Sequence, residues 1–285
     1  MSTATQTTNA PAVDQVWSPT LACDGLTVRL IGIGGIGGIV ARYVAIFLAS
    51  LRYETSLLLI DGDAFEPKNA SRMLFRSYGN KAEVVRADLL EHLVDSRLTL
   101  MAVNQSVTPE NISTLLASGV NEVILLCVDN HGTRKLISDY CAGRAGSPGI
   151  DDICVISGGN DGVGADSSGV TRRGSYGNVQ VYIRRGGTDV SPSLTAFHKE
   201  IDQPPQQAAD GTHCTHMLDS TPQLLFTNLL TASAICNTFW LYLCNAIHYS
   251  EVGFDVVDAR MRPLDIPAPT WPSCSPTAGK TSLPL

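Results

Sequence analysis

A run of glycines at residues 32–38, with the sequence GIGGIGG, constrains this chain more than any other feature. Residues 27–33, which include the first two residues of the run, have the apolar character of a buried strand. A helical pattern begins at Gly37. Glycines at such a junction allow a tight turn and a close approach of the backbone to a ligand. The N-terminus of the following helix offers free N–H groups to a phosphate. The run predicts a phosphate-binding turn or, without a ligand, a plain tight turn.

Short apolar runs alternate with helical patterns through the first half of the chain. Strands are predicted at residues 27–33, 56–60, 98–103 and 122–128, and helices from residue 37, at 81–94, at 109–119 and at 133–141. Parallel strands joined by crossover helices form sheets that bind ligands at the carboxyl ends of their strands. The sequence therefore predicts an α/β fold, a doubly wound and mostly parallel Rossmann-like sheet with helices on both faces.

The pattern changes after residue 150. In order, there follow a strand at 153–157, a Gly/Ser-rich stretch at 158–177, an alternating run at 179–183, a long loop at 186–221, an apolar helix, and strands near 254–257 and 262–266. This order predicts an antiparallel C-terminal extension of the sheet. Four segments are expected: a flexible N-terminal segment (1–24), a nucleotide-binding half (25–160), a substrate-binding half with the long loop and the apolar helix (161–266), and a Pro-rich tail (267–285).

Composition excludes several classes of protein. Twenty Lys and Arg stand against 27 Asp and Glu, a net charge of −7 that argues against nucleic acid as a partner. The eight cysteines include no Cys-x-x-Cys pair, so a four-thiolate zinc site has no support and reduced, cytoplasmic thiols are expected. The first residues lack the basic start and apolar stretch of a signal peptide.

Residues 220–247 carry no charged side chain and are numerous enough to span a bilayer. Asparagine and threonine side chains are spread through the segment, and unpaired amides are costly in lipid. The sequence therefore favours a buried helix and no membrane partner.

An acidic residue, Asp61, follows the second strand and lies where a carboxylate binds the ribose of either NAD or ATP. The next segment, residues 61–72 (DGDAFEPKNASR), is followed by Lys81 and by residues 129–134 (DNHGTR). Cations neutralise a triphosphate and a carboxylate holds magnesium, so these residues favour nucleotidyl transfer over hydride transfer.

Taken in order, these residues resemble the ThiF, MoeB and ubiquitin-activating enzyme superfamily of acyl-adenylating enzymes. The matching positions are Gly32, Gly34, Gly35, Gly37, Asp61, Asp63, Glu66, Asn69, Arg72, Lys81-Ala82, Asp129-Asn130 and Thr133-Arg134. The resemblance covers residues 25–160, and Ala70 and Met73 stand where the family has Leu and Gln. The family's amino-terminal helix, with an Arg that reaches into the partner subunit, has no evident counterpart. A narrower resemblance, over residues 156–159, 177–181 and 220–228, is to ThiF-type members of bacterial PRTRC gene clusters.

The resemblance implies a nucleotide site. By position, Asp61 would bind the ribose, Asn69, Arg72 and Lys81 the phosphates, and Asp129 the magnesium. The glycines of the turn, Asp63 and Asn130 complete the expected binding set, and Arg72, Lys81 and Asp129 are the expected catalytic groups.

The resemblance also implies a reaction and partners. ATP and Mg²⁺ would activate the C-terminal glycine carboxylate of a ubiquitin-like or sulfur-carrier protein as an acyl-adenylate. A conjugating enzyme and a second copy of the chain, forming a homodimer, are further expected partners. Three alternatives stay open: an NAD-dependent oxidoreductase, a non-catalytic nucleotide-binding module, and adenylation of a small molecule, peptide or RNA-linked carboxylate.

Cys214 lies in the sequence His213-Cys214-Thr215-His216, at the end of the long loop, where related enzymes place a thioester or persulfide cysteine. A thiolate there can take the acyl group from AMP, with a neighbouring histidine lowering the thiol pKa. The same residues with Asp219 can instead bind a metal, and Cys214 can also be a free loop cysteine. From its position in the loop, we expect Cys214 to be a fourth catalytic residue.

Overall fold

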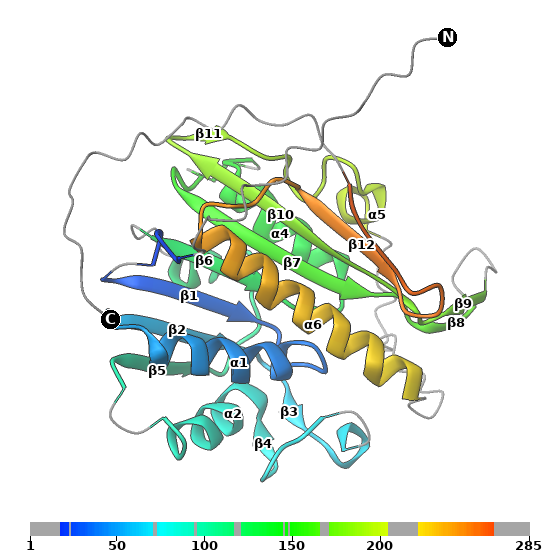
Figure 1. The fold of residues 1–285 in the computed structure, drawn as a ribbon, viewed down its shortest axis with the longest axis horizontal. Coiled ribbons are helices and arrows are strands. Elements are labelled where there is room, and N and C mark those ends of the chain that lie inside the picture. Colours follow the sequence, from blue (N-terminus) through cyan, green and yellow to red (C-terminus); the bar gives the residue numbers. More distant parts are fainter. Residues whose placement is uncertain are drawn as a thin grey trace.

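The structure is a computed structural model that describes residues 18–22, 24–70, 73–93, 96–116, 121–144, 146–147, 149–165, 171–204 and 222–264 (Figure 1). Its elements are β1 (Leu26–Ile31), α1 (Gly37–Ser50), β2 (Thr55–Ile60), β3 (Ala64–Phe65), the 3-10 turn η1 (Pro67–Asn69), β4 (Gly79–Asn80), α2 (Lys81–Leu90), β5 (Leu98–Val103), α3 (Ile112–Leu115), β6 (Glu122–Leu126), α4 (His131–Cys141), β7 (Ile153–Asn160), β8 (Val163–Ala165), β9 (Thr171–Arg173), β10 (Tyr176–Arg185), β11 (Thr188–Asp189), α5 (Lys199–Asp202), α6 (Pro222–Leu243), β12 (Glu251–Asp255) and β13 (Arg260–Leu264).

One sheet organises these elements. Its strand order is β13-β12-β10-β7-β6-β1-β2-β5, and β11 pairs with β10. The strands from β5 to β7 are parallel, whereas β10, β12 and β13 run antiparallel to their neighbours. The predicted α/β fold is confirmed, including the antiparallel extension. The predicted halves 25–160 and 161–266 share this single sheet, because β7 and β10 pair along eight residues.

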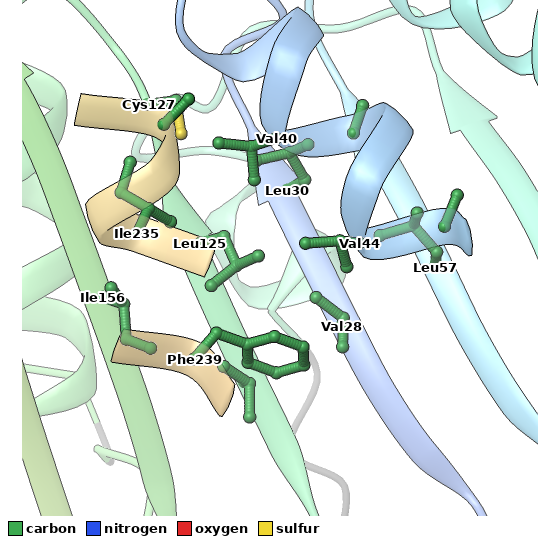
Figure 2. Packing of buried hydrophobic residues seen from close by; sticks show 14 of the residues in the cluster. Val28, Leu30, Val40, Val44, Leu57, Leu125, Cys127, Ile156, Ile235 and Phe239 are labelled. Atoms are coloured by element: carbon green, nitrogen blue, oxygen red, sulfur yellow. The ribbon is translucent and has the colours of Figure 1, made fainter. Parts of the chain in front are cut away.

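Helices cover both faces of the sheet (Figure 1). On the face of α1, α2 and α6, Val40 and Val44 of α1 and Ile235 and Phe239 of α6 pack over apolar side chains of the parallel strands, such as Leu125 (Figure 2). The opposite face packs a second apolar cluster against α3 and α4. Strands buried on both faces are continuously apolar, which explains why the sequence showed runs such as TSLLLI without polar alternation.

The uncharged segment predicted as a buried helix is α6, and that prediction is confirmed. Its threonines are satisfied internally: Thr231 Oγ1 donates to the carbonyl of Thr227 at 2.8 Å, and Thr238 and Tyr249 hydroxyls lie 2.9 Å apart. Among the helices that the structure describes, none combines the length and apolarity needed to cross a bilayer.

Several predicted boundaries were wrong. The helix expected at 109–119 is the short α3. The residue at its N-cap is Asn111, whose Oδ1 accepts from the backbone N–H of Thr108. The helix expected from 133 begins at His131, because Asn130 caps it. The Gly/Ser-rich stretch holds the hairpin of β8 and β9, and the expected long loop holds β11 and α5.

Candidate functional site

The carboxyl ends of the central strands meet at one edge of the sheet. In the strand register, Ile31 of β1 lies opposite Ile60 of β2 on one side and Leu126 of β6 on the other. The residues that follow these three strands therefore lie beside one another. They include Gly32, Asp61 and, three residues beyond β6, Asp129, so the fold brings the predicted glycine turn and both key carboxylates to the same edge.

The glycine turn joins β1 to α1 and depends on its glycines. Gly32 has a φ of +88°, in the left-handed region, and a Cβ there would lie 2.9 Å from the backbone of Cys127. A Cβ on Gly37 would lie 1.8 Å from the carbonyl oxygen of Gly32. In the described part of the chain, no hydrogen-bond acceptor faces the backbone N–H groups of Gly34, Gly35 and Ile36. These groups form the open N-terminus of α1, where the helix dipole favours an anion.

Asp61 ties the turn to the end of β2. Its Oδ2 accepts from the N–H of Ile33 at 2.5 Å, and its Oδ1 accepts from the N–H of Asp63 at 2.8 Å. Burial raises the pKa of Asp61, while the charge of Lys81 and these two hydrogen bonds oppose the rise. Carboxylate oxygens have further lone pairs, so Asp61 can still accept from a ligand hydroxyl.

Lys81 is the first residue of α2 and is held against the loop after β2. Its Nζ lies 2.8 Å from Oδ2 of Asp63, and its backbone N–H donates to the Asp63 carbonyl at 2.9 Å. The Lys81 side chain is only 11 % exposed, whereas that of Asp63 is 70 % exposed. An ion pair with so exposed a carboxylate contributes little, so a phosphate can take the Lys81 ammonium from Asp63.

Asn80 is a component of the site that sequence reasoning missed. Its Nδ2 donates to the carbonyls of Asp61 (2.7 Å) and Asp63 (3.0 Å) and to Oδ1 of Asn104 (2.9 Å), while its Oδ1 caps α2 by accepting from Glu83 N–H. Asn104 follows β5, so one buried amide joins the ends of two strands to the helix that carries Lys81. The N-cap is recognisable in the sequence, but the three longer-range contacts are not.

Asn80→Asp is expected to lower the free energy of unfolding by roughly 2–3 kcal/mol at pH 7, because a carboxylate would face three acceptor oxygens. Asn80→Ser keeps a capping oxygen and removes the amide N–H₂ without adding a charge, so it should cost less. The introduced carboxyl is disfavoured in its charged form, so its folded-state pKa is raised. Its penalty therefore grows as pH rises above the unfolded value, about 3.9, and shrinks toward acid. Urea unfolding at pH 4.5 and 7 measures this, and equal losses at both pH values would contradict it.

Asn69 and Asn130, two predicted ligands, make local hydrogen bonds. Asn69 Oδ1 accepts from the N–H of Glu66 at 2.8 Å within the capping box of η1. Asn130 Oδ1 accepts from Thr133 N–H at 2.7 Å and so caps α4. Arg72 and Cys214, with His213, His216 and Asp219, lie outside the described residues.

Asp129 is exposed at the end of β6, and its carboxylate makes no hydrogen bond or ion pair with a described residue. Behind it, the buried guanidinium of Arg134 donates to Ser157 Oγ (2.8 Å) and to the carbonyls of Val128 (2.8 Å) and Gly158 (2.9 Å). Burial lowers the pKa of Arg134, and the Asp129 charge opposes this. Arg134 therefore joins the ends of β6 and β7 and adds positive charge behind Asp129, a role that sequence reasoning also missed.

The carboxylate oxygens at this edge suit a cation that also binds oxygen atoms of a bound nucleotide. Within the described ranges, no group of three His, Cys, Asp or Glu side chains is placed to hold a metal ion. Magnesium commonly binds through one or two carboxylates, with the remaining positions filled by phosphate oxygens and water. The carboxylate of Asp129, which no described residue binds, is a ligand of that kind.

A second charged group, which the sequence did not suggest, lies where α5 packs against α4. His198 Nδ1 lies 2.6 Å from Glu200 and its Nε2 2.8 Å from Glu251. The hydrogen bond to Glu251 is the main cause that raises the pKa of His198 to about 9. The ion pair joins the segment before α5 to β12, next to the start of the undescribed residues 205–221.

Comparison with known proteins places this arrangement in a family. The model of the ThiF family matches residues 23–260. The vegetative protein HesA of Trichormus variabilis is 29 % identical over 117 residues, which are 40 % of this chain and 42 % of that protein. Among solved structures, E. coli MccB with ATP has a TM-score of 0.57 and 16 % identity, covering 88 % of this chain and 66 % of its own. PaaA has a TM-score of 0.56 and 17 % identity, covering 87 % and 65 %.

This chain thus spans less than half of HesA and slightly under two thirds of the two solved chains. At these identities the solved structures establish a shared fold. The family model extends over both halves of the sheet, from before β1 to the start of β13. The chain therefore belongs to the ThiF family.

Proposed function

We propose that this protein uses Mg·ATP to activate a carboxylate as an acyl-adenylate, with release of pyrophosphate. The observation that carries the proposal is the edge of the sheet itself. There the open N-terminus of α1, Lys81 and the carboxylate of Asp129, which no described residue binds, surround the end of β1. Membership of the ThiF family supports it, and so does the fold shared with E. coli MccB, which was crystallised with ATP.

In this proposal each predicted residue has a physical role. Asp61 accepts from the ribose, and the N–H groups of the Gly32–Gly37 turn, with Asp63 and Asn130 nearby, line the nucleotide site. Lys81 moves from Asp63 to the phosphates, which Arg72 and the amide N–H₂ of Asn69 also contact. Asp129 holds magnesium, which would neutralise charge on the triphosphate.

The chemical step needs little from the protein beyond alignment. An oxygen of the substrate carboxylate attacks the α-phosphorus, the bond from that phosphorus to the bridging oxygen of the β-phosphate breaks, and pyrophosphate leaves. The carboxylate is already a nucleophile, so no general base is required. Lys81 and Arg72 stabilise the charge that develops on the phosphate oxygens.

The proposed substrate is the C-terminal glycine of a ubiquitin-like or sulfur-carrier protein, as expected from the family resemblance. Other structures of MccB contain MccA, so a peptide carboxylate is the main competing substrate. A conjugating enzyme as the next acceptor, and a cytoplasmic homodimer as the working form, belong to the same proposal.

We further propose that Cys214 accepts the acyl group from AMP as a thioester. Cys214→Ala should then leave ATP–pyrophosphate exchange within about twofold of wild type and abolish a conjugate that thiols cleave. Exchange and gel mobility with and without dithiothreitol measure the two steps. Loss of exchange together with the conjugate would instead give Cys214 a structural role.

The experiment that tests the proposed function is ATP–pyrophosphate exchange with three substrates: carriers ending in glycine, the same carriers lacking that glycine, and short peptides. Exchange that depends on the terminal glycine would support the full proposal. Exchange with peptides alone would indicate that the activated carboxylate belongs to a peptide. ATP binding without exchange would contradict catalysis and indicate a binding module, and bound reduced nicotinamide would contradict adenylation.

A further inference from the structure

An amide from the second half of the chain lies against the glycine turn. Asn228 is in the N-terminal part of α6 and is only 6 % exposed. A Cβ on Gly35 would lie 2.6 Å from Asn228 Nδ2, so the amide sits directly on the glycine. Asn228 Oδ1 accepts from Nδ2 of Asn160, at the end of β7, at 2.9 Å. This hydrogen bond directs the N–H₂ group of Asn228 toward the turn.

The N–H₂ group of Asn228 lacks an acceptor. No described residue accepts a hydrogen bond from it, and the same holds for the backbone N–H groups of Gly34, Gly35 and Ile36 beside it. Although the Asn228 side chain as a whole is only 6 % exposed, its Nδ2 is not among the fully enclosed orphan atoms of the described residues, so it remains reachable by a ligand. Asp61, a carboxylate beside the turn, is already bound to Ile33 and Asp63. Several donors and a helix N-terminus thus converge on a place where no described residue supplies an acceptor.

We propose that Asn228 binds the ligand of the turn directly, its Nδ2 donating to an anionic oxygen, with Asn160 as the residue that positions the amide. The oxygen belongs either to the nucleotide phosphates or to the carboxylate that is activated. The inference rests on the proposed function and extends it, because it makes α6, from the second half of the chain, part of the anion site.

Asn228→Asp tests this with minimal change of shape. The new carboxylate still accepts from Asn160, but it replaces a donor by a negative charge facing the bound anion. Asn237→Asp is the matched control, because Asn237 is exposed on the same helix and receives the same charge. Both proteins are assayed as full chains for affinity toward Mg·ATP and inorganic pyrophosphate by calorimetry, for KM of the carrier in exchange, and for Tm.

We expect Asn228→Asp to weaken ATP and pyrophosphate binding at least tenfold, with Asn237→Asp unchanged. Unchanged ATP affinity with a tenfold rise in carrier KM would assign the oxygen to the substrate carboxylate. All values within twofold of wild type would overturn the proposal. Should Asn228→Asp fail to fold, Asn160→Ala, which frees the amide to rotate, is expected to lose affinity threefold or more, and no loss would overturn it.

The outcomes also separate this inference from the proposed function. A wild-type chain that binds ATP but exchanges with no carboxylate would contradict adenylation. In that case, weaker ATP and pyrophosphate binding by Asn228→Asp would still support the role of Asn228, and unchanged binding would overturn it. A wild-type chain that binds neither ATP nor pyrophosphate would overturn both.

Discussion

Asp129→Asn is expected to reduce ATP–pyrophosphate exchange by about 10²- to 10³-fold with little change in stability. Asp129 is exposed and makes no hydrogen bond or ion pair with any described residue, so an isosteric amide removes no contact within the described fold. The amide lacks the charge that binds a hard cation. Arg134 behind it would also lose a nearby negative charge, so the proposed magnesium site would become more positive.

The control for this change is Asp151→Asn. Asp151 is exposed just before β7, at the amino end of the strand and hence at the opposite edge of the sheet. The Asp151→Asn protein should catalyse ATP–pyrophosphate exchange at the wild-type rate. A magnesium titration adds a second readout, since the Asp129→Asn protein should need a higher concentration of the cation for half-maximal exchange. Normal exchange at an unchanged magnesium requirement would remove Asp129 from the proposed mechanism.

Local signals explain which parts of the fold were predictable. A glycine that needs a left-handed φ, such as Gly32, and an asparagine at a helix N-cap, such as Asn130, act over a few residues, and their patterns are visible in a sequence. The parallel order of the first strands follows from the crossover helices between them. These signals predicted the sheet edge at which Gly32, Asp61 and Asp129 meet.

The missed residues act over longer distances. Asn80 meets Asn104 across 24 positions, and Asn160 meets Asn228 across 68. Such contacts depend on strand register and on the return of α6 over α1, neither of which composition or spacing reveals. Arg134 is similar, because the motif gave its position but not the burial of its guanidinium against β7.

Asn69 shows how far the position of a residue in a motif can predict its role. Its position in the resemblance implied phosphate binding, yet its Oδ1 accepts from the Glu66 backbone and helps to shape η1. Position in a motif does not separate a residue that touches a ligand from one that shapes the loop around it. Only its amide N–H₂ remains for a ligand in the proposed function.

Two adjacent glycines provide the largest expected contrast in stability. A Cβ on Gly37 would lie 1.8 Å from the Gly32 carbonyl oxygen, whereas a Cβ on Gly38 would meet nothing within 4 Å. Gly37→Ala must therefore displace the turn or the start of α1, and we expect it to lower the free energy of unfolding by roughly 3–5 kcal/mol. Gly38→Ala should raise it by about 0.5–1 kcal/mol, because alanine favours the helix.

Urea unfolding of the two variants measures this contrast, and ATP binding shows whether the turn is the nucleotide site. Gly38→Ala should bind ATP as the wild type does, while any folded Gly37→Ala protein should bind it at least tenfold more weakly, since its N–H groups no longer converge. Similar stabilities for the two variants would contradict the close contact between Gly37 and Gly32. A destabilised Gly37→Ala protein with normal ATP affinity would confirm that contact and place the nucleotide elsewhere, because the same displacement cannot spare a phosphate held by this backbone.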